Sequence, residues 1–188
     1  MGEMGPILII VAAVVLIPIF WWIGTKNGFV KVKNHIAESW ADIDVQLKRR
    51  YDLIPNLVET VKGYASHEKE LLEKLVAARE HAISAHGVHN QAEAAGQVDA
   101  AASMLMARME AYPDLKASAN FLQLQQELAD TEDRIAAARR FYNANVRQWN
   151  TMLQMFPSSI IANSSGYMPE EFFEITNPIE RENVQVKF

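Results

Sequence analysis

The chain contains no cysteine, and it has only eight glycines and seven prolines among 188 residues. The lack of cysteine excludes disulfides, thiolate metal sites and cysteine nucleophiles. Few helix-breaking residues, together with abundant alanine, glutamine, leucine and glutamate, indicate an all-α protein. The length fits one compact domain with an additional anchoring segment.

Familiar catalytic motifs are missing as well. The sequence has no GxSxG nucleophile turn, no glycine-rich P-loop and no HExxH zinc motif. The net charge of −5 makes nucleic acid an unexpected partner. We therefore expect no enzymatic activity, no catalytic residue, no cofactor and no bound metal.

Charged residues are absent from residues 4–25, and residues 7–23 are almost all large and apolar. A membrane-spanning helix needs about 20 such residues. Trp21 and Trp22 at its end suit the lipid–water interface. A cleaved signal peptide fits poorly, because no basic segment precedes the run and no small-x-small site closes it. We predict that residues 1–25 are a transmembrane anchor that contacts the lipid bilayer through residues 4–25.

The basic residues near this anchor lie on one side of it. Lys26, Lys31 and Lys33 follow the apolar run, and no Lys or Arg precedes it. The positive-inside rule then predicts a single-pass protein of the cell membrane with its N-terminus outside and its folded domain in the cytoplasm. A periplasmic domain is the alternative.

A long amphipathic pattern follows the anchor. Its apolar positions alternate in steps of four and three, as expected for one face of a long helix. We call this face the first seam: Ile36, Trp40, Ile43, Leu47, Arg50, Ile54, Leu57 and Val61. Arg50 is its one charged member, so it must extend to water or meet a carboxylate. Asp44, Asp52, Glu132 and Asp133 are the candidates.

Pro55 lies inside the same pattern and cannot donate a backbone hydrogen bond to the Tyr51 carbonyl. One interpretation is a kinked helix that continues through Pro55. The other is a new helix with Asp52 as its cap and Pro55 in its first turn. The first seam keeps its phase across Pro55, which favours the kinked helix.

Three further helices are predicted, at about residues 67–86, 90–110 and 118–155. The last of them carries a second seam: Phe121, Leu124, Leu128, Thr131, Ile135, Ala138, Tyr142, Asn145, Trp149, Met152 and Phe156. Polar Thr131 and Asn145 resemble the residues that set register in coiled coils. Two long and two shorter helices predict an antiparallel four-helix bundle over residues 26–156. Residues 157–188 are rich in helix breakers and predict an extended tail, docked on the bundle or on a neighbouring subunit, with a possible strand at 183–188.

Several motifs together resemble those of the LemA family of bacterial membrane proteins. They are the N-terminal membrane segment, IDVQLKRRYDLIPNLVETVKGYASHE, AARE, FLQLQQELADTEDRIAAARRFYNANVRQWN, FPSSIIA and the EEFFE tail. The resemblance implies a four-helix bundle domain and supplies no reaction. Residues carried over to matching motif positions are Asp42, Asp44, Gln46, Arg49, Arg50, Asp52, Pro55, Asn56, Tyr64, His67, Glu68, Glu132, Arg134, Arg139, Tyr142 and Asn143.

One set of charged and polar residues could converge if the two long helices are antiparallel neighbours. It comprises Arg49, Arg50, Asp52, Pro55 and Asn56 on the first helix, and Glu132, Arg134, Arg139 and Asn143 on the last. The structural interpretation is a buried network that fixes helix register. The functional interpretation is a docking or catalytic pocket near the kink. We favour the structural one.

Histidine is the remaining candidate for chemistry. His81, His86 and His89 lie close in sequence, with His67 and Glu68 upstream. His86 and His89 straddle Gly87 in a predicted loop and have no cysteine to help them hold a metal. We interpret them as solvated loop residues.

These observations favour a membrane-anchored structural protein that forms a scaffolding homo-oligomer. The alternative is an adaptor or sensor that presents the bundle to an unidentified membrane or signalling protein. A metal-dependent hydrolase is the remote third possibility.

Overall fold

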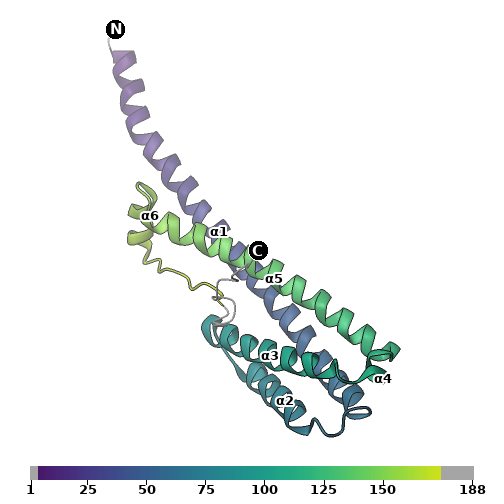
Figure 1. Ribbon diagram of the computed structural model, residues 1–188. Coiled ribbons are helices and arrows are strands. Elements are labelled where there is room, and N and C mark those ends of the chain that lie inside the picture. Colours follow the sequence, from purple (N-terminus) through teal and green to yellow (C-terminus); the bar gives the residue numbers. More distant parts are fainter. Residues whose placement is uncertain (1–3, 175–188) are drawn as a thin grey trace, which may run out of the picture. The chain divides into compact units, whose positions relative to one another are not determined.

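The computed structural model describes residues 4–174, with side chains described from residue 9. This part of the chain is mostly helical and contains no strand, so the all-α prediction is confirmed for it. The predicted strand at 183–188 lies outside the described residues. Figure 1 shows the six helices in chain order: α1 (Met4–Lys62), α2 (Lys69–Ser84), α3 (Val88–Met109), α4 (Pro113–Lys116), α5 (Ala119–Gln154) and α6 (Ser158–Ser165).

Helix α1 is continuous over 59 residues and passes through both Pro18 and Pro55. No new helix begins at Asp52, so the interpretation with a single helix through Pro55 is the right one. The N-terminal part of α1 contains an 18-residue window of mean hydropathy 2.0 in which no residue is buried. By length and composition, this helix could cross a membrane, which is compatible with a single-pass membrane protein.

The predicted ends of α2, α3 and α5 lie within two residues of the observed ones. The short helix α4 was not predicted. Pro113 occupies its first turn, where the missing amide hydrogen costs nothing. Its Leu115 side chain is fully buried.

The prediction of a wholly extended tail was wrong, because residues 158–165 form helix α6. Ile161 and Ala162 bury one side of this helix, which offsets the weak helix propensity of its serines and asparagine. Gly166 ends it in a left-handed conformation with φ of 66°. From there to residue 174 the chain forms neither helix nor strand.

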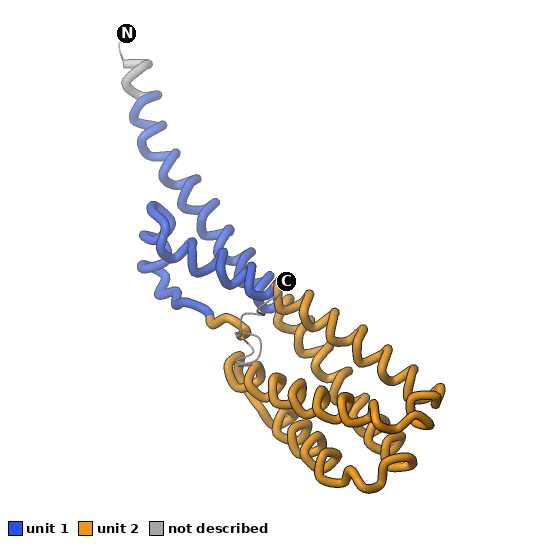
Figure 2. The backbone as a smooth tube through the Cα atoms, in the orientation of Figure 1, with its two compact units in different colours: residues 1–38, 142–170 blue, residues 39–141, 171–188 orange. Residues whose placement is uncertain are grey.

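The chain divides into two compact units (Figure 2). Unit 1 combines the residues up to Glu38 with Tyr142–Glu170, and unit 2 combines Ser39–Phe141 with the residues from Glu171 onward. Helices α1 and α5 each contribute to both units.

Unit 1 has an aromatic core. The ring centroid of Phe29 on α1 lies 5.4 Å from that of Trp149 on α5 and 5.1 Å from that of Tyr167. Trp149 and Tyr167 are themselves 5.2 Å apart. The Trp149 indole N–H donates to the Met168 carbonyl at 2.8 Å, and Asn150 exchanges two 2.9 Å hydrogen bonds with the backbone of Glu170. Residues 167–170 are thereby fixed against α5.

Unit 2 has an aliphatic core built on the first seam from Trp40 to Val61, while Ile36 belongs to unit 1. Every member of this seam is buried except Trp40, which is half-buried and whose ring lies 5.9 Å from that of Phe173. Most of the second seam is also buried or half-buried. Its last member, Phe156, is 80% exposed and does not belong to the buried face.

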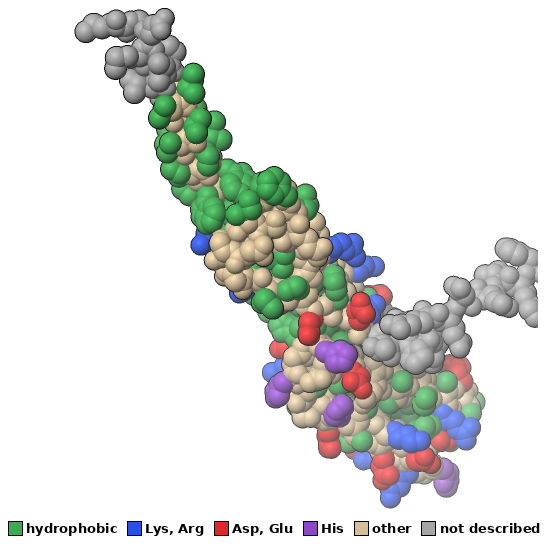
Figure 3. Space-filling view, turned by 90° about the vertical axis from the view of Figure 1, so that its left-hand side faces the viewer, with side chains coloured by type: hydrophobic (Ala, Val, Ile, Leu, Met, Phe, Trp, Pro, Cys, Tyr) green, Lys and Arg blue, Asp and Glu red, His purple; other side chains and the backbone are tan. Residues whose placement is uncertain are grey.

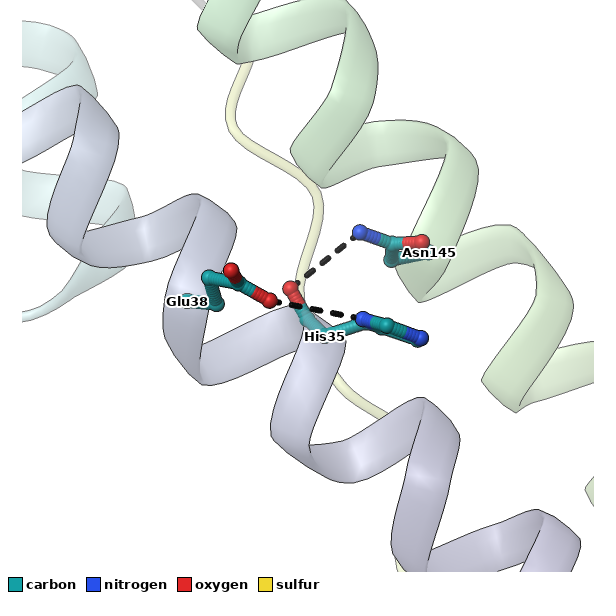
Figure 4. A network of polar contacts seen from close by, with 3 residues as sticks. All are labelled: His35, Glu38 and Asn145. Carbon is teal, nitrogen blue, oxygen red and sulfur yellow. Dashed lines mark hydrogen bonds and ion pairs between the residues drawn. The ribbon is translucent and has the colours of Figure 1, made fainter.

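The two polar members of the second seam behave differently. The buried Thr131 hydroxyl donates to the Glu127 carbonyl of its own helix at 2.7 Å. This hydrogen bond therefore does not link α5 to a neighbouring helix. The Asn145 amide instead donates across unit 1 to the backbone carbonyl of His35 on α1, at 3.2 Å. Figure 4 shows this bond beside the 3.4 Å contact between the His35 ring and Glu38. Asn145 can therefore set register, and Thr131 does not.

Candidate functional site

Arg50 lies in the middle of the buried face of α1, in unit 2, and its side chain is only 8% exposed. It forms an ion pair with Asp99 of α3 and a second one, at 3.1 Å, with Glu132 of α5. The guanidinium therefore joins three helices. A cation at this position is tolerable because two carboxylates balance it.

The electrostatics of this cluster follow from its burial. Burial lowers the pKa of the Arg50 guanidinium, and the Glu132 carboxylate opposes that shift. Burial also raises the pKa of the neighbouring Tyr51 phenol. The Arg50 Nη1 atom has no partner with hydrogen-bond geometry, so its contact with Glu132 is mainly electrostatic. Both carboxylates are engaged by the same cation, which leaves the cluster without an evident reacting group.

Of the predicted network, Arg50 and Glu132 form an ion pair. Arg49, Asp52, Pro55 and Asn56 lie on the exposed side of α1, and Arg134 is exposed on α5. Arg139 and Asn143 are half-buried. Within the described residues, no ion pair joins Arg134 or Arg139 to the cluster.

Sequence reasoning missed Asp99, the more buried of the two carboxylates. Asp99 is an isolated acid in an alanine-rich helix, where its neighbours Ala95 and Val98 are fully buried. An acidic side chain beside such a face needs a cation from another element. The position of Asp99 beside this apolar face was the feature of the sequence that could have identified it as a partner of Arg50.

A side chain of α2 bonds to the backbone carbonyl of α1 that Pro55 leaves without its usual donor. Because proline has no amide hydrogen, the Tyr51 carbonyl lacks its usual bond from residue 55. The Arg79 Nε–H donates to that carbonyl at 2.7 Å. Arg79 thus satisfies a backbone acceptor left open by Pro55 and ties α2 to α1.

A third polar contact holds the turn between α1 and α2. The Glu68 carboxylate accepts hydrogen bonds from Arg108 Nε at 2.7 Å and from the Tyr112 hydroxyl at 2.8 Å. The hydrogen bonds from Arg108 and Tyr112 lower the pKa of Glu68. The bond to Glu68 correspondingly raises the pKa values of Arg108 and Tyr112.

Two hollows in unit 2 adjoin α2. The larger, of about 670 Å³, lies between α1 and α2, and we call it the α1–α2 groove. Apolar side chains and charged ones both line it: Val58, Lys62, Ser66, Lys69, Leu72, Glu73, Val76, Ala77 and Glu80. The smaller, of about 380 Å³, includes Asp52 and Tyr51 of α1 and His86.

The histidines do not converge. His67, His81, His86 and His89 are all exposed, and His81 contacts Gln97 at 3.1 Å. Among residues 4–174, no group of three or more His, Asp or Glu side chains is placed to hold a metal ion.

These features define a helical, membrane-associated protein with a buried cluster of charges that joins three of its helices. The chain belongs to the LemA family, whose family model matches residues 39–188. It is 29% identical to protein LemA of Metamycoplasma hominis over 88% of this chain and 75% of that protein. It is also 24% identical to magnetosome protein MamQ of Magnetospirillum gryphiswaldense and 23% identical to MamQ 2 of Paramagnetospirillum magneticum. These two matches cover 78% and 79% of this chain and 64% of either relative. None of these names denotes an enzymatic activity, and the predicted family is confirmed.

Proposed function

We propose that this protein is a membrane-anchored scaffold that assembles into a homo-oligomer and acts by binding helices rather than by catalysis. The observation that carries the proposal is the α1–α2 groove of unit 2. An apolar groove between two helices suits the apolar face of a third helix. The four-helix bundle predicted from the two seams would then present this groove to other subunits.

The Arg50 cluster supports a structural role. Its guanidinium is shared between Asp99 and Glu132, which belong to two other helices. A catalytic acid or base must instead reach a substrate atom within hydrogen-bond distance. An ion-pair cluster that specifies which helices meet supports a structural role for the bundle.

The edge of the groove supports a second copy of the chain as the occupant. Lys62 and Lys69 provide positive charge, and Glu73 and Glu80 provide negative charge. A surface with both signs can complement itself when two identical copies meet. Val76 and Ala77 remain accessible on its floor.

Ala77→Glu tests this proposal in the full chain reconstituted in lipid nanodiscs. Ala77 is exposed, so the substitution places a charge in the groove without disturbing the core. Ala129→Glu, at an exposed position of α5, is the matched control. Native mass spectrometry should show an oligomer for the parent chain and the control, and monomers for Ala77→Glu. A monomeric parent chain would contradict the proposal.

A photo-crosslinking residue at position 77 identifies the occupant in cells. Crosslinks between copies of this chain support the scaffold. A stoichiometric crosslink to a different membrane protein would overturn self-assembly and favour the adaptor role. The photo-crosslinking residue placed at position 129 instead is the control, because any crosslink formed there does not involve the groove.

A further inference from the structure

The turn between α5 and α6, taken here together with the first residues of α6, exposes several large apolar side chains. Met155, Phe156 and Ile160 have exposed fractions of 57%, 80% and 49%. The surrounding sequence contains no Asp, Glu, Lys or Arg from Gln148 to Pro169. An apolar, uncharged projection of this kind marks a contact with another apolar phase.

Contacts between α5 and α1 within unit 1 show which residues of α1 lie beside this turn. Asn145 bonds to His35, and Met152 lies beside Gly28, with its Cε atom 3.6 Å from where a Cβ on Gly28 would be. Met152 is seven residues further along α5, and Gly28 is seven residues back along α1, so the helices are antiparallel. The same register brings Gln154, the last residue of α5, to the level of Lys26, directly after the uncharged run of α1, and the turn follows Gln154.

The turn is held by local hydrogen bonds and by burial of its inner side. The Ser158 hydroxyl oxygen lies 2.7 Å from the carbonyl of Met152, in the last turn of α5, and 2.8 Å from that of Met155, just after α5. The Ser159 amide donates to the Met155 carbonyl at 2.8 Å. Ile161 and Ala162 are buried on the inner face of α6. The exposed side chains are therefore presented from a fixed structure.

We propose that the α5–α6 turn is a second membrane contact, in which Met155, Phe156 and Ile160 enter the lipid interface beside the end of the α1 span. Exposed apolar side chains cover the N-terminal part of α1 and continue onto the adjoining end of unit 1 in Figure 3. Trp21 and Trp22 lie about one helical turn before Lys26 on α1 and suit the same interface. Lys26 follows one residue after the uncharged run and can reach anionic headgroups.

This second contact would restrict how α1 rotates and tilts in the bilayer. A single helix in a bilayer is free to rotate about its axis and to tilt. A second insertion point on the same unit removes that freedom, because the turn must stay in the interface. The inference goes beyond the scaffold function and does not depend on it, although it does require α1 to cross the bilayer.

The absence of native cysteine permits a direct test in the full chain. Phe156→Cys and Ile160→Cys place an environment-sensitive fluorophore on the turn, and both positions are exposed. Gln148→Cys, exposed on α5 about two helical turns from Phe156, is the matched control. The proteins are reconstituted in nanodiscs of phosphatidylcholine and phosphatidylglycerol at one copy per disc, and their thermal unfolding verifies that the labels are tolerated.

Labels at positions 156 and 160 should emit at shorter wavelength and be several-fold less accessible to iodide than the label at position 148. They should also be quenched by a lipid carrying a nitroxide near its headgroup. Equal iodide accessibility at positions 156 and 148 would overturn the proposal. Protection that appears only when several copies share a disc would also overturn it, because the turn would then contact a second copy. Since the decisive measurement uses single copies, it does not depend on whether the chain forms the proposed scaffold.

Discussion

Arg50 shows how one charged residue can occupy an apolar seam. Its long side chain reaches Asp99 and Glu132 on two different helices. Removing one member of a buried ion pair leaves the others desolvated without compensation, whereas replacing the whole set by apolar groups is often tolerated. The cluster therefore specifies which helices meet more than it adds net stability.

Arg50→Met should lower the free energy of unfolding by about 3 kcal/mol, because Asp99 then remains poorly hydrated without a cation. Arg49→Met is the control, since Arg49 is exposed and a surface change of this kind costs at most about 0.5 kcal/mol. Chemical denaturation measures both. The double variant Arg50→Met/Asp99→Leu should recover much of the loss. Equal effects at positions 49 and 50 would show that the cluster does not hold the helices together.

Pro55 and Arg79 form a second pair that can be tested by a double-mutant cycle. Arg79→Ala should cost about 1–2 kcal/mol, because the Tyr51 carbonyl then loses the hydrogen bond that Arg79 donates to it. In the background of Pro55→Ala the same substitution should cost less, since the amide of residue 55 can bond to that carbonyl. Arg140→Ala, at an exposed position of α5, controls for removal of a surface arginine. Additive effects of the two substitutions would contradict the assignment.

At the scale of the element, the turn between α1 and α2 depends on a single carboxylate. Glu68 links this turn to the end of α3 through Arg108 and to the residue before α4 through Tyr112. Its side chain is only 11% exposed. The carboxylate accepts both bonds when it is ionised, so its contribution depends on pH.

The pKa of Glu68 is lowered in the folded chain from its ordinary value of 4.5. Folding therefore favours the ionised form, and the resulting stability is present above pH 4.5 and lost as the pH falls through the lower folded pKa. Glu68→Gln should melt below the parent chain at pH 7, and the difference should shrink as the pH is lowered beneath 4.5. Glu93→Gln, at an exposed position of α3, should show no such change. A difference in melting temperature that is independent of pH would refute the role of the charge.

Helix positions were predictable because the periodicity of α1, α2, α3 and α5 is a local property of the sequence. The Arg50–Glu132 pair was predictable because both residues lie near the seams of the two long helices. Asp99 and Arg79 were not identified, because their partners depend on which helices become neighbours. Helix α6 was missed because Pro157 and the following serines indicate a loop, whereas burial of Ile161 supplies the stabilisation that local propensity lacks.

At the scale of the whole molecule, α1 combines two kinds of surface. Its N-terminal part is apolar and exposed, and its C-terminal part carries the first seam. The candidate span and the first seam both belong to α1, which runs from Met4 to Lys62. The side of the membrane on which unit 2 lies therefore follows from the orientation of that one helix.

The basic residues after the span predict a cytoplasmic unit 2, since Lys26, Lys31 and Lys33 all follow it. The chain has no cysteine, so Ala129→Cys, at an exposed position of α5, is a unique reporter. In spheroplasts of a bacterial host, a membrane-impermeant maleimide should modify it only after lysis. Changing the three exposed lysines to glutamate removes the charge asymmetry and should make a fraction reactive in intact spheroplasts. Modification of the parent reporter before lysis would instead place unit 2 in the periplasm, because the maleimide reaches only that side.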